Sequence, residues 1–210
     1  MKRAWFIGTL TVGVLVSWSS VHAQDGNYVV TQRGVRIATE KYSRTADTLL
    51  SETQLVSGVA VIVEKARLEL HSNSPITFDA EAAAGASMQR MHIDVAAENA
   101  KIRFVIAGFT KDTSVALARG VPVLLFQNFV FATLQPLADL RPAPGAGSRQ
   151  IAVLNVQTAM LSMWSVESTS TNKTAITADG GLRIELVFSG QRLSEVHIPA
   201  QGVDVVTGAP

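Results

Sequence analysis

The chain has 210 residues, no cysteine and a formal net charge of +1, and 47% of its residues are hydrophobic. Without cysteine the protein has no disulfide, no thiol nucleophile and no cysteine-ligated zinc or haem. Basic and acidic residues are interspersed without a run of one sign, which argues against a nucleic-acid-binding surface and a polybasic membrane-binding surface. The length is that of one domain with a core large enough to be stable without disulfides.

The first 23 residues have the pattern of a secretory signal peptide. Lys2 and Arg3 supply a positive start, an uncharged and mainly apolar run extends from Trp5 to Trp18, and a site with small residues ends at Ala23. We expect cleavage after Ala23; a retained membrane anchor is the alternative. Residues 24–210 would then form a single β-rich domain with 16 basic and 17 acidic side chains. The sequence predicts a periplasmic or secreted protein with no membrane span after cleavage.

Apolar and polar residues alternate with a period of two over much of the remaining chain. Residues 35–42 (VRIATEKY) and 59–70 show this pattern, and in both the even-numbered positions, Glu40 and Glu64 among them, share one face of the expected strand. Similar short segments follow as far as residue 198, separated by turns that contain glycine, asparagine or aspartate. About 11–12 strands at this spacing predict a mainly β protein: an antiparallel open half-barrel or sandwich with one short helix.

The segment 121–140 (VPVLLFQNFVFATLQPLADL) interrupts this alternation and is the most apolar part of the chain after the signal peptide. Val121 precedes a proline, which favours an extended backbone that the next apolar residues continue. Asn128 can cap a helix of about two turns, which Pro136 would end or kink. Such a helix is either a plug that fills one end of the sheet or a wall of an apolar ligand cavity. The plug is the more ordinary interpretation of apolar periodicity.

No motif for a catalytic chemistry stands out. Three histidines follow the signal peptide: His71, His92 and His197. His92 shares a strand face with the acid Asp94, and this pair would need a third ligand to hold a metal. The sequence contains no GxSxG nucleophile elbow and no glycine-rich phosphate loop ending in Lys-Ser/Thr. We therefore predict no catalytic residue, metal site or cofactor. An enzyme is the less favoured class, and a hydrolase would need one of these histidines beside a serine and an acid in a cleft.

Two stretches resemble the LolA-type lipoprotein carriers and related exported bacterial β-proteins. Residues 34–42 (GVRIATEKY) are similar to the first hairpin of such proteins, and residues 128–134 (NFVFATL) lie about where these proteins place a helix against the concave face of their sheet. The resemblance covers most of the mature chain in outline. It implies a half-barrel whose apolar concave face holds an acyl chain or a hydrophobic partner.

The hypothesis that follows is an exported binding or carrier module for an apolar ligand, such as a lipid or an acyl chain, in the cell envelope. The alternative is a non-enzymatic scaffold or protein-interaction domain with a filled core, which an envelope protein would contact at an exposed apolar patch or a long edge strand. Under the first hypothesis, the candidate ligand-binding residues are the apolar side chains of the central segment: Val123, Leu125, Phe126, Phe129, Phe131 and Leu134.

Overall fold

A computed structural model of the chain describes residues 24–58, 60–178 and 180–208. The signal-peptide prediction for residues 1–23 lies outside this part of the chain. Within it, the protein is mainly β and folds as one open sheet of 15 strands with one short α-helix, which confirms the predicted fold class. The strands outnumber the 11 or 12 expected, in part because the short segment Val203–Thr207 pairs as a strand between two others.

The elements in chain order are β1 (Gln24–Gln32), β2 (Val35–Arg44), β3 (Thr48–Ser57), β4 (Ala60–His71), β5 (Ser74–Ala84), β6 (Ser87–Val95), β7 (Asn99–Ile106), β8 (Phe109–Ala116), β9 (Val123–Phe126), η1 (Phe131–Leu134), α1 (Leu137–Leu140), β10 (Ser148–Asn155), β11 (Met160–Ser168), β12 (Lys173–Thr177), β13 (Arg183–Ser189), β14 (Arg192–Ile198), η2 (Pro199–Gln201) and β15 (Val203–Thr207). The elements η1 and η2 are single 3-10 turns.

The strand order is that of two meanders joined in the middle of the sheet. Strands β1 to β8 pair with their neighbours in sequence, as do β9 to β15, and β15 pairs with β1. Every pairing in the described chain is antiparallel except that of β9 with β10. The edge strands are therefore β8 and β9, which only residues 117–122 separate in sequence. This connection spans at most about 25 Å, so the sheet has to curl until its two edges approach each other.

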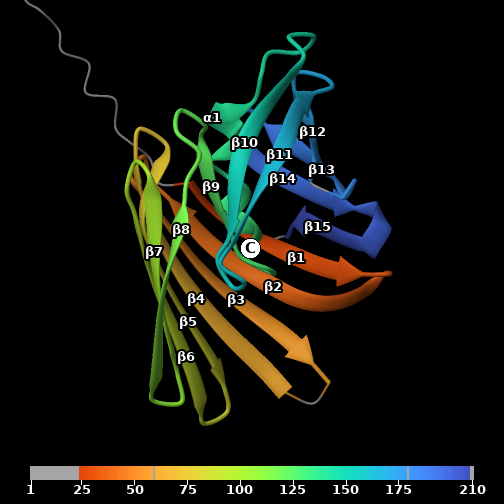
Figure 1. The fold of residues 1–210 in the computed structure, drawn as a ribbon. Coiled ribbons are helices and arrows are strands. Elements are labelled where there is room, and N and C mark those ends of the chain that lie inside the picture. The colour runs from red at the N-terminus through yellow and green to blue at the C-terminus, as the bar shows by residue number, and fades with distance from the viewer. Residues whose placement is uncertain (1–23, 59, 179, 209–210) are drawn as a thin grey trace, which may run out of the picture.

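Figure 1 shows the result: a strongly curved sheet with the short helical turns on its concave side. We call residues 127–140, which contain η1 and α1, the plug. Its apolar side chains form part of the main core, with Val130, Phe131, Leu134 and Leu137 each at most 3% exposed. The segment therefore fills the concave side of the sheet, as the plug interpretation predicted.

The plug differs in detail from the helix expected from the sequence. Asn128 does not begin a helix, because the chain passes through Phe129 with a φ of 65° before η1 starts at Phe131. The turn η1 ends at Leu134, close to the position that the proline predicts, and a second turn, α1, begins after Pro136. Proline fits the first turn of a helix because the missing N–H is not needed there. Two separate turns thus replace the single helix.

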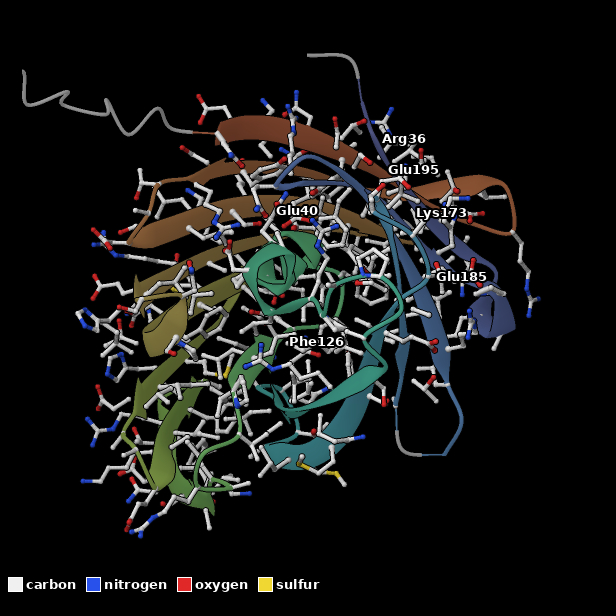
Figure 2. All side chains as sticks on the ribbon, turned by 90° about the horizontal axis from the view of Figure 1, so that it is seen from above. Arg36, Glu40, Phe126, Lys173, Glu185 and Glu195 are labelled. Atoms are coloured by element: carbon white, nitrogen blue, oxygen red, sulfur yellow. The ribbon has the colours of Figure 1, made fainter. Side chains whose placement is uncertain are left out.

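The alternation separates the two faces of the strands, and the structure buries the even-numbered face of β4. On β4, Ala66, Leu68 and Leu70 are buried, whereas Lys65 and Arg67 are exposed on the convex face. The convex face carries cross-strand ion pairs of both signs, such as Lys65–Glu52, Arg90–Glu81 and Arg103–Asp112. Figure 2 shows further charged residues on the outer side: Arg36, Lys173, Glu185 and Glu195. Among the described residues, no helix is long and apolar enough to cross a membrane.

Candidate functional site

A row of polar side chains crosses the otherwise apolar concave face. The cross-strand register places Tyr28 of β1, Glu40 of β2, Thr53 of β3 and Glu64 of β4 side by side. Tyr28, Glu40 and Thr53 are fully buried, and Glu64 is partly exposed. Polar groups at buried positions require hydrogen-bond partners, and here the plug provides them.

Each member of this row contacts a different position of the plug, so the plug crosses the four strands and has polar contacts with each of them. On β1, the Tyr28 hydroxyl accepts a hydrogen bond from Gln135 Nε2 (2.6 Å). On β2, the Glu40 carboxylate accepts from the backbone N–H groups of Phe131 (2.9 Å) and Ala132 (3.1 Å). On β3, Thr53 Oγ1 donates to the carbonyl of Phe129 (3.4 Å), and on β4, Glu64 accepts from Gln127 Nε2.

Glu40 acts as the N-terminal cap of η1. No side chain of the plug caps this turn, and the carboxylate from β2 accepts its first two N–H groups instead. Ser51 of β3 donates a third hydrogen bond of 2.6 Å to the same carboxylate. In Figure 2, Glu40 lies between its strand and the coil of the plug. The helical turn therefore depends on a strand that is 91 residues earlier in the sequence.

The C-terminal part of the plug contacts both halves of the sheet. Gln135 reaches Tyr28 through its amide nitrogen, while its amide oxygen accepts from the backbone N–H of Leu193 on β14 (3.0 Å). The Tyr28 hydroxyl donates to the carbonyl of Leu193 (2.7 Å). Arg44 of β2 donates to the carbonyl of Gln135 (3.1 Å) and pairs with Asp139 of α1 (3.0 Å). These bonds hold the plug at the junction of the two meanders.

A groove lies next to the N-terminal end of the plug, beside Gln127 and Phe129. The row continues from Glu64 to Ala82 of β5 and Gln89 of β6, and the groove lies over these strands on the concave face. Its volume is about 360 Å³. Ala80, Ala82 and Ala84 of β5 leave room because their side chains are small. Apolar walls come from several strands and the plug: Leu55, Ile62, Met91, Phe104, Ile106 and Phe129.

The structure brings only one of the six predicted ligand-binding residues to this groove, namely Phe129. Leu125, Phe131 and Leu134 are core residues with at most 3% exposure. Phe126 packs against Trp164 with ring centroids 5.7 Å apart, and Val123 pairs with Ala152 in the ladder of β9 and β10. Their assignment to a ligand stays a prediction.

Most residues of the groove were not among the candidates predicted from the sequence. The alternation did place Glu64 on the same strand face as Leu68 and Leu70, and an acid on this face is the signal from which the location could have been found. The alanine run of β5 was uninformative by itself, because alanine is compatible with core, surface and turns. Gln127 lies in the central segment, but periodicity did not distinguish it from its neighbours.

The histidines lie on the convex face, away from the groove. His92 contacts Asp79 (2.7 Å) and Asp94 (3.2 Å), and the hydrogen bond with Asp79 is the main cause of its raised pKa. His197 contacts Asp204 (2.7 Å) and Glu195 (3.0 Å), which raise its pKa in the same way. Within the described ranges, no group of three or more His, Asp or Glu side chains is arranged to hold a metal.

Comparisons with known proteins identify a fold and no family. No protein-family model matches the sequence, and no curated protein matches it. Among solved structures, a DUF1089 family protein from Pseudomonas aeruginosa aligns with a TM-score of 0.54 and 10% identity, over 79% of this chain and 90% of that chain. At this identity the likeness shows a shared mainly β fold alone. It does not confirm the resemblance to LolA-type carriers.

Glu40→Ala tests the cap of the plug, because it leaves two buried N–H groups without an acceptor. Each such group costs about 1–3 kcal/mol, so we expect the free energy of unfolding in urea at pH 7 to fall by at least about 2 kcal/mol. Glu52→Ala is the matched control, since Glu52 pairs with Lys65 across 3.8 Å on the convex face and should cost no more than about 0.5 kcal/mol. Equal losses in the two variants would contradict this role of Glu40.

The buried carboxyls also predict how stability depends on pH. Burial raises the pKa of Glu40 to about 7, against the opposing effect of its three hydrogen-bond donors. Burial likewise raises the pKa of Glu64 to about 7. A carboxyl with a raised folded-state pKa stabilises the protein fully below its unfolded pKa, and this contribution is lost as the pH rises through the folded pKa.

Between pH 5 and 6 we therefore expect the free energy of unfolding to decrease, by up to about 1.4 kcal/mol per carboxyl. Urea denaturation at pH 5.0, 5.5 and 6.0 measures this slope below the usual histidine pKa of about 6.5, where the contribution of the histidines is small. The double variant Glu40→Gln/Glu64→Gln should have a much flatter slope. Stability that increases over this range in the unmodified protein would show that these carboxyls are already ionised in the fold.

Proposed function

We propose that the protein is a binding or carrier module for a slender apolar ligand, an acyl or alkyl chain, held in the groove beside the plug. The observation that carries the proposal is the groove itself: an apolar space of about 360 Å³ on the concave face, walled by the plug and the sheet. Ligand sites are typically concave, mainly apolar and about 300–1,000 Å³ in volume. This groove is at the lower end of that range, which favours a single chain over a larger ligand.

The hairpins around the open end of the groove support this use. The turns β3–β4, β5–β6 and β7–β8 lie at this end, and residues 53–63, 82–89 and 104–110 contain no ionisable side chain. Ile106 and Phe109 at the last of these turns are 47% and 81% exposed. An uncharged rim lowers the barrier for an apolar ligand, because no charged group has to be desolvated as the ligand enters.

The proposed location is the periplasm or the extracellular space. It is supported by the signal-peptide pattern of residues 1–23. A carrier in that compartment would move its ligand between envelope membranes or deliver it to an envelope protein.

The second candidate is a scaffold or protein-interaction domain without a ligand. It is favoured by the plug, whose apolar side chains are core residues and whose polar groups are bonded to four strands. On this hypothesis the exposed residues of the hairpins, among them Phe109, would contact a protein partner. Ligand binding distinguishes the two candidates, because a scaffold has no use for the groove.

Filling the groove is the direct test. Ala82→Phe places a ring over the floor of the groove, and we expect it to weaken binding of the neutral fluorescent probe N-phenyl-1-naphthylamine at least tenfold, as followed by fluorescence titration. Ala84→Leu, a smaller change on the same strand, should have a weaker effect of the same kind. Ser114→Phe on the exposed convex face of β8 is the matched control and should bind like the unmodified protein.

Circular dichroism and urea denaturation establish that the variants are folded. Two results would contradict the carrier function and favour the scaffold. One is the absence of saturable probe binding to the unmodified protein, and the other is binding that Ala82→Phe and Ser114→Phe change equally.

A further inference from the structure

The end of the groove next to the plug is polar, in contrast to its floor and walls. Glu64 and Gln127 lie there, one from β4 and the other from the start of the plug. Gln127 is only 2% exposed, and its amide nitrogen donates to the Glu64 carboxylate. Its amide oxygen is buried and has no hydrogen-bond partner in the described part of the chain. A buried acceptor without a donor is unusual in a folded protein and calls for an explanation.

We infer that Gln127 and Glu64 receive the hydroxyl head of a single-chain amphiphile, such as a long-chain alcohol or a monoacylglycerol. The inference rests on the proposed function, since it requires that the chain of the ligand occupies the groove. It adds the chemical class of the ligand: an uncharged head that donates a hydrogen bond, on one apolar chain.

The free acceptor determines which head is suitable. This oxygen has almost no accessible surface in the structure, so a ligand hydroxyl reaches it when the Gln127 side chain turns towards the groove. The hydroxyl then donates to the amide oxygen and recovers the hydrogen bond that this atom lost when it was buried. A hydrocarbon without a polar head leaves this oxygen unpaired. Glu64 is the last residue of the polar row that the plug covers. The ligand hydroxyl would therefore lie next to it and extend the row by one polar group.

Anionic heads are unsuitable for the same site. A carboxylate or a phosphate only accepts hydrogen bonds, and it would face the amide oxygen of Gln127 and the carboxyl group of Glu64. Arg90 is the one basic residue among those that line the groove. Its side chain is 63% exposed and pairs with Glu81 at 3.0 Å, so its charge is already balanced outside the groove.

The apolar chain would extend from this head towards the hairpins. The floor along this path is formed by Ala82 and Ala84, and Ile106 stands at the end of the groove near the β7–β8 turn. The exposed apolar side chains there, Ile106 and Phe109, would contact the end of a chain longer than the groove. The polar head of the ligand would thus contact the polar end of the groove, and its apolar chain would contact the apolar floor and walls.

Competition with the fluorescent probe tests the inference. Dodecan-1-ol and dodecanoate have the same chain length and differ in the head, and both are titrated against the bound probe at pH 8, where dodecanoate is ionised. We expect the alcohol to displace the probe at a concentration at least tenfold lower than dodecanoate. Gln127→Leu should reduce this preference at least fivefold while the probe still binds. Gln89→Leu, which changes a polar residue of the groove away from the head site, should preserve it.

Glu64→Gln provides a second variant that keeps the hydrogen-bonding capacity and the size of the side chain. It should improve dodecanoate binding relative to the alcohol, because it removes the negative charge. Equal displacement by the two compounds, or a preference that Gln127→Leu and Glu64→Gln leave unchanged, would overturn the hydroxyl site while the carrier function stands. Absence of probe binding to the unmodified protein would overturn both.

Discussion

The structure depends on how the polar groups of the plug are satisfied inside a curved sheet. The turns η1 and α1 have four residues each, too few to form a stable helix in water by themselves. They persist because one polar side chain from each of four neighbouring strands bonds to the plug. Glu40 caps η1, and plug residues outside the two turns bond to Tyr28, Thr53 and Glu64. The sheet therefore stabilises the conformation of the plug, and the plug in turn supplies the hydrogen-bond partners that these side chains need.

The groove follows from the same arrangement. The sheet is wider than the plug, so β5 and β6 continue the row with Ala82 and Gln89 beyond the last contact of the plug. Small side chains on β5 leave this surface hollow. Glu64 and Gln127 stand at the boundary, bonded to each other on one side and adjacent to the groove on the other. A single row of residues thus accounts for both the position of the plug and the candidate site.

The sequence predicted what depends on local periodicity. On β2 and β4 the alternation separated the two faces, because one face is buried and the other is in water. It did not predict that β15 joins the two meanders, since pairing partners far apart leave no local signal. The single helix from Asn128 was wrong because the cap comes from Glu40. The groove was missed because it arises from alanines on one strand and a glutamine of the plug, which come together only when the sheet curls.

Hydrogen exchange at the amides of Phe131 and Ala132 tests the central claim most directly, because these N–H groups are the ones that Glu40 accepts. If the polar row holds the plug as part of the core, these amides exchange only through global unfolding, as slowly as the central amides of β1 and β2. Exchange as fast as that of exposed turns, in a protein whose strands remain protected, would show that the plug opens independently of the sheet and would contradict this account.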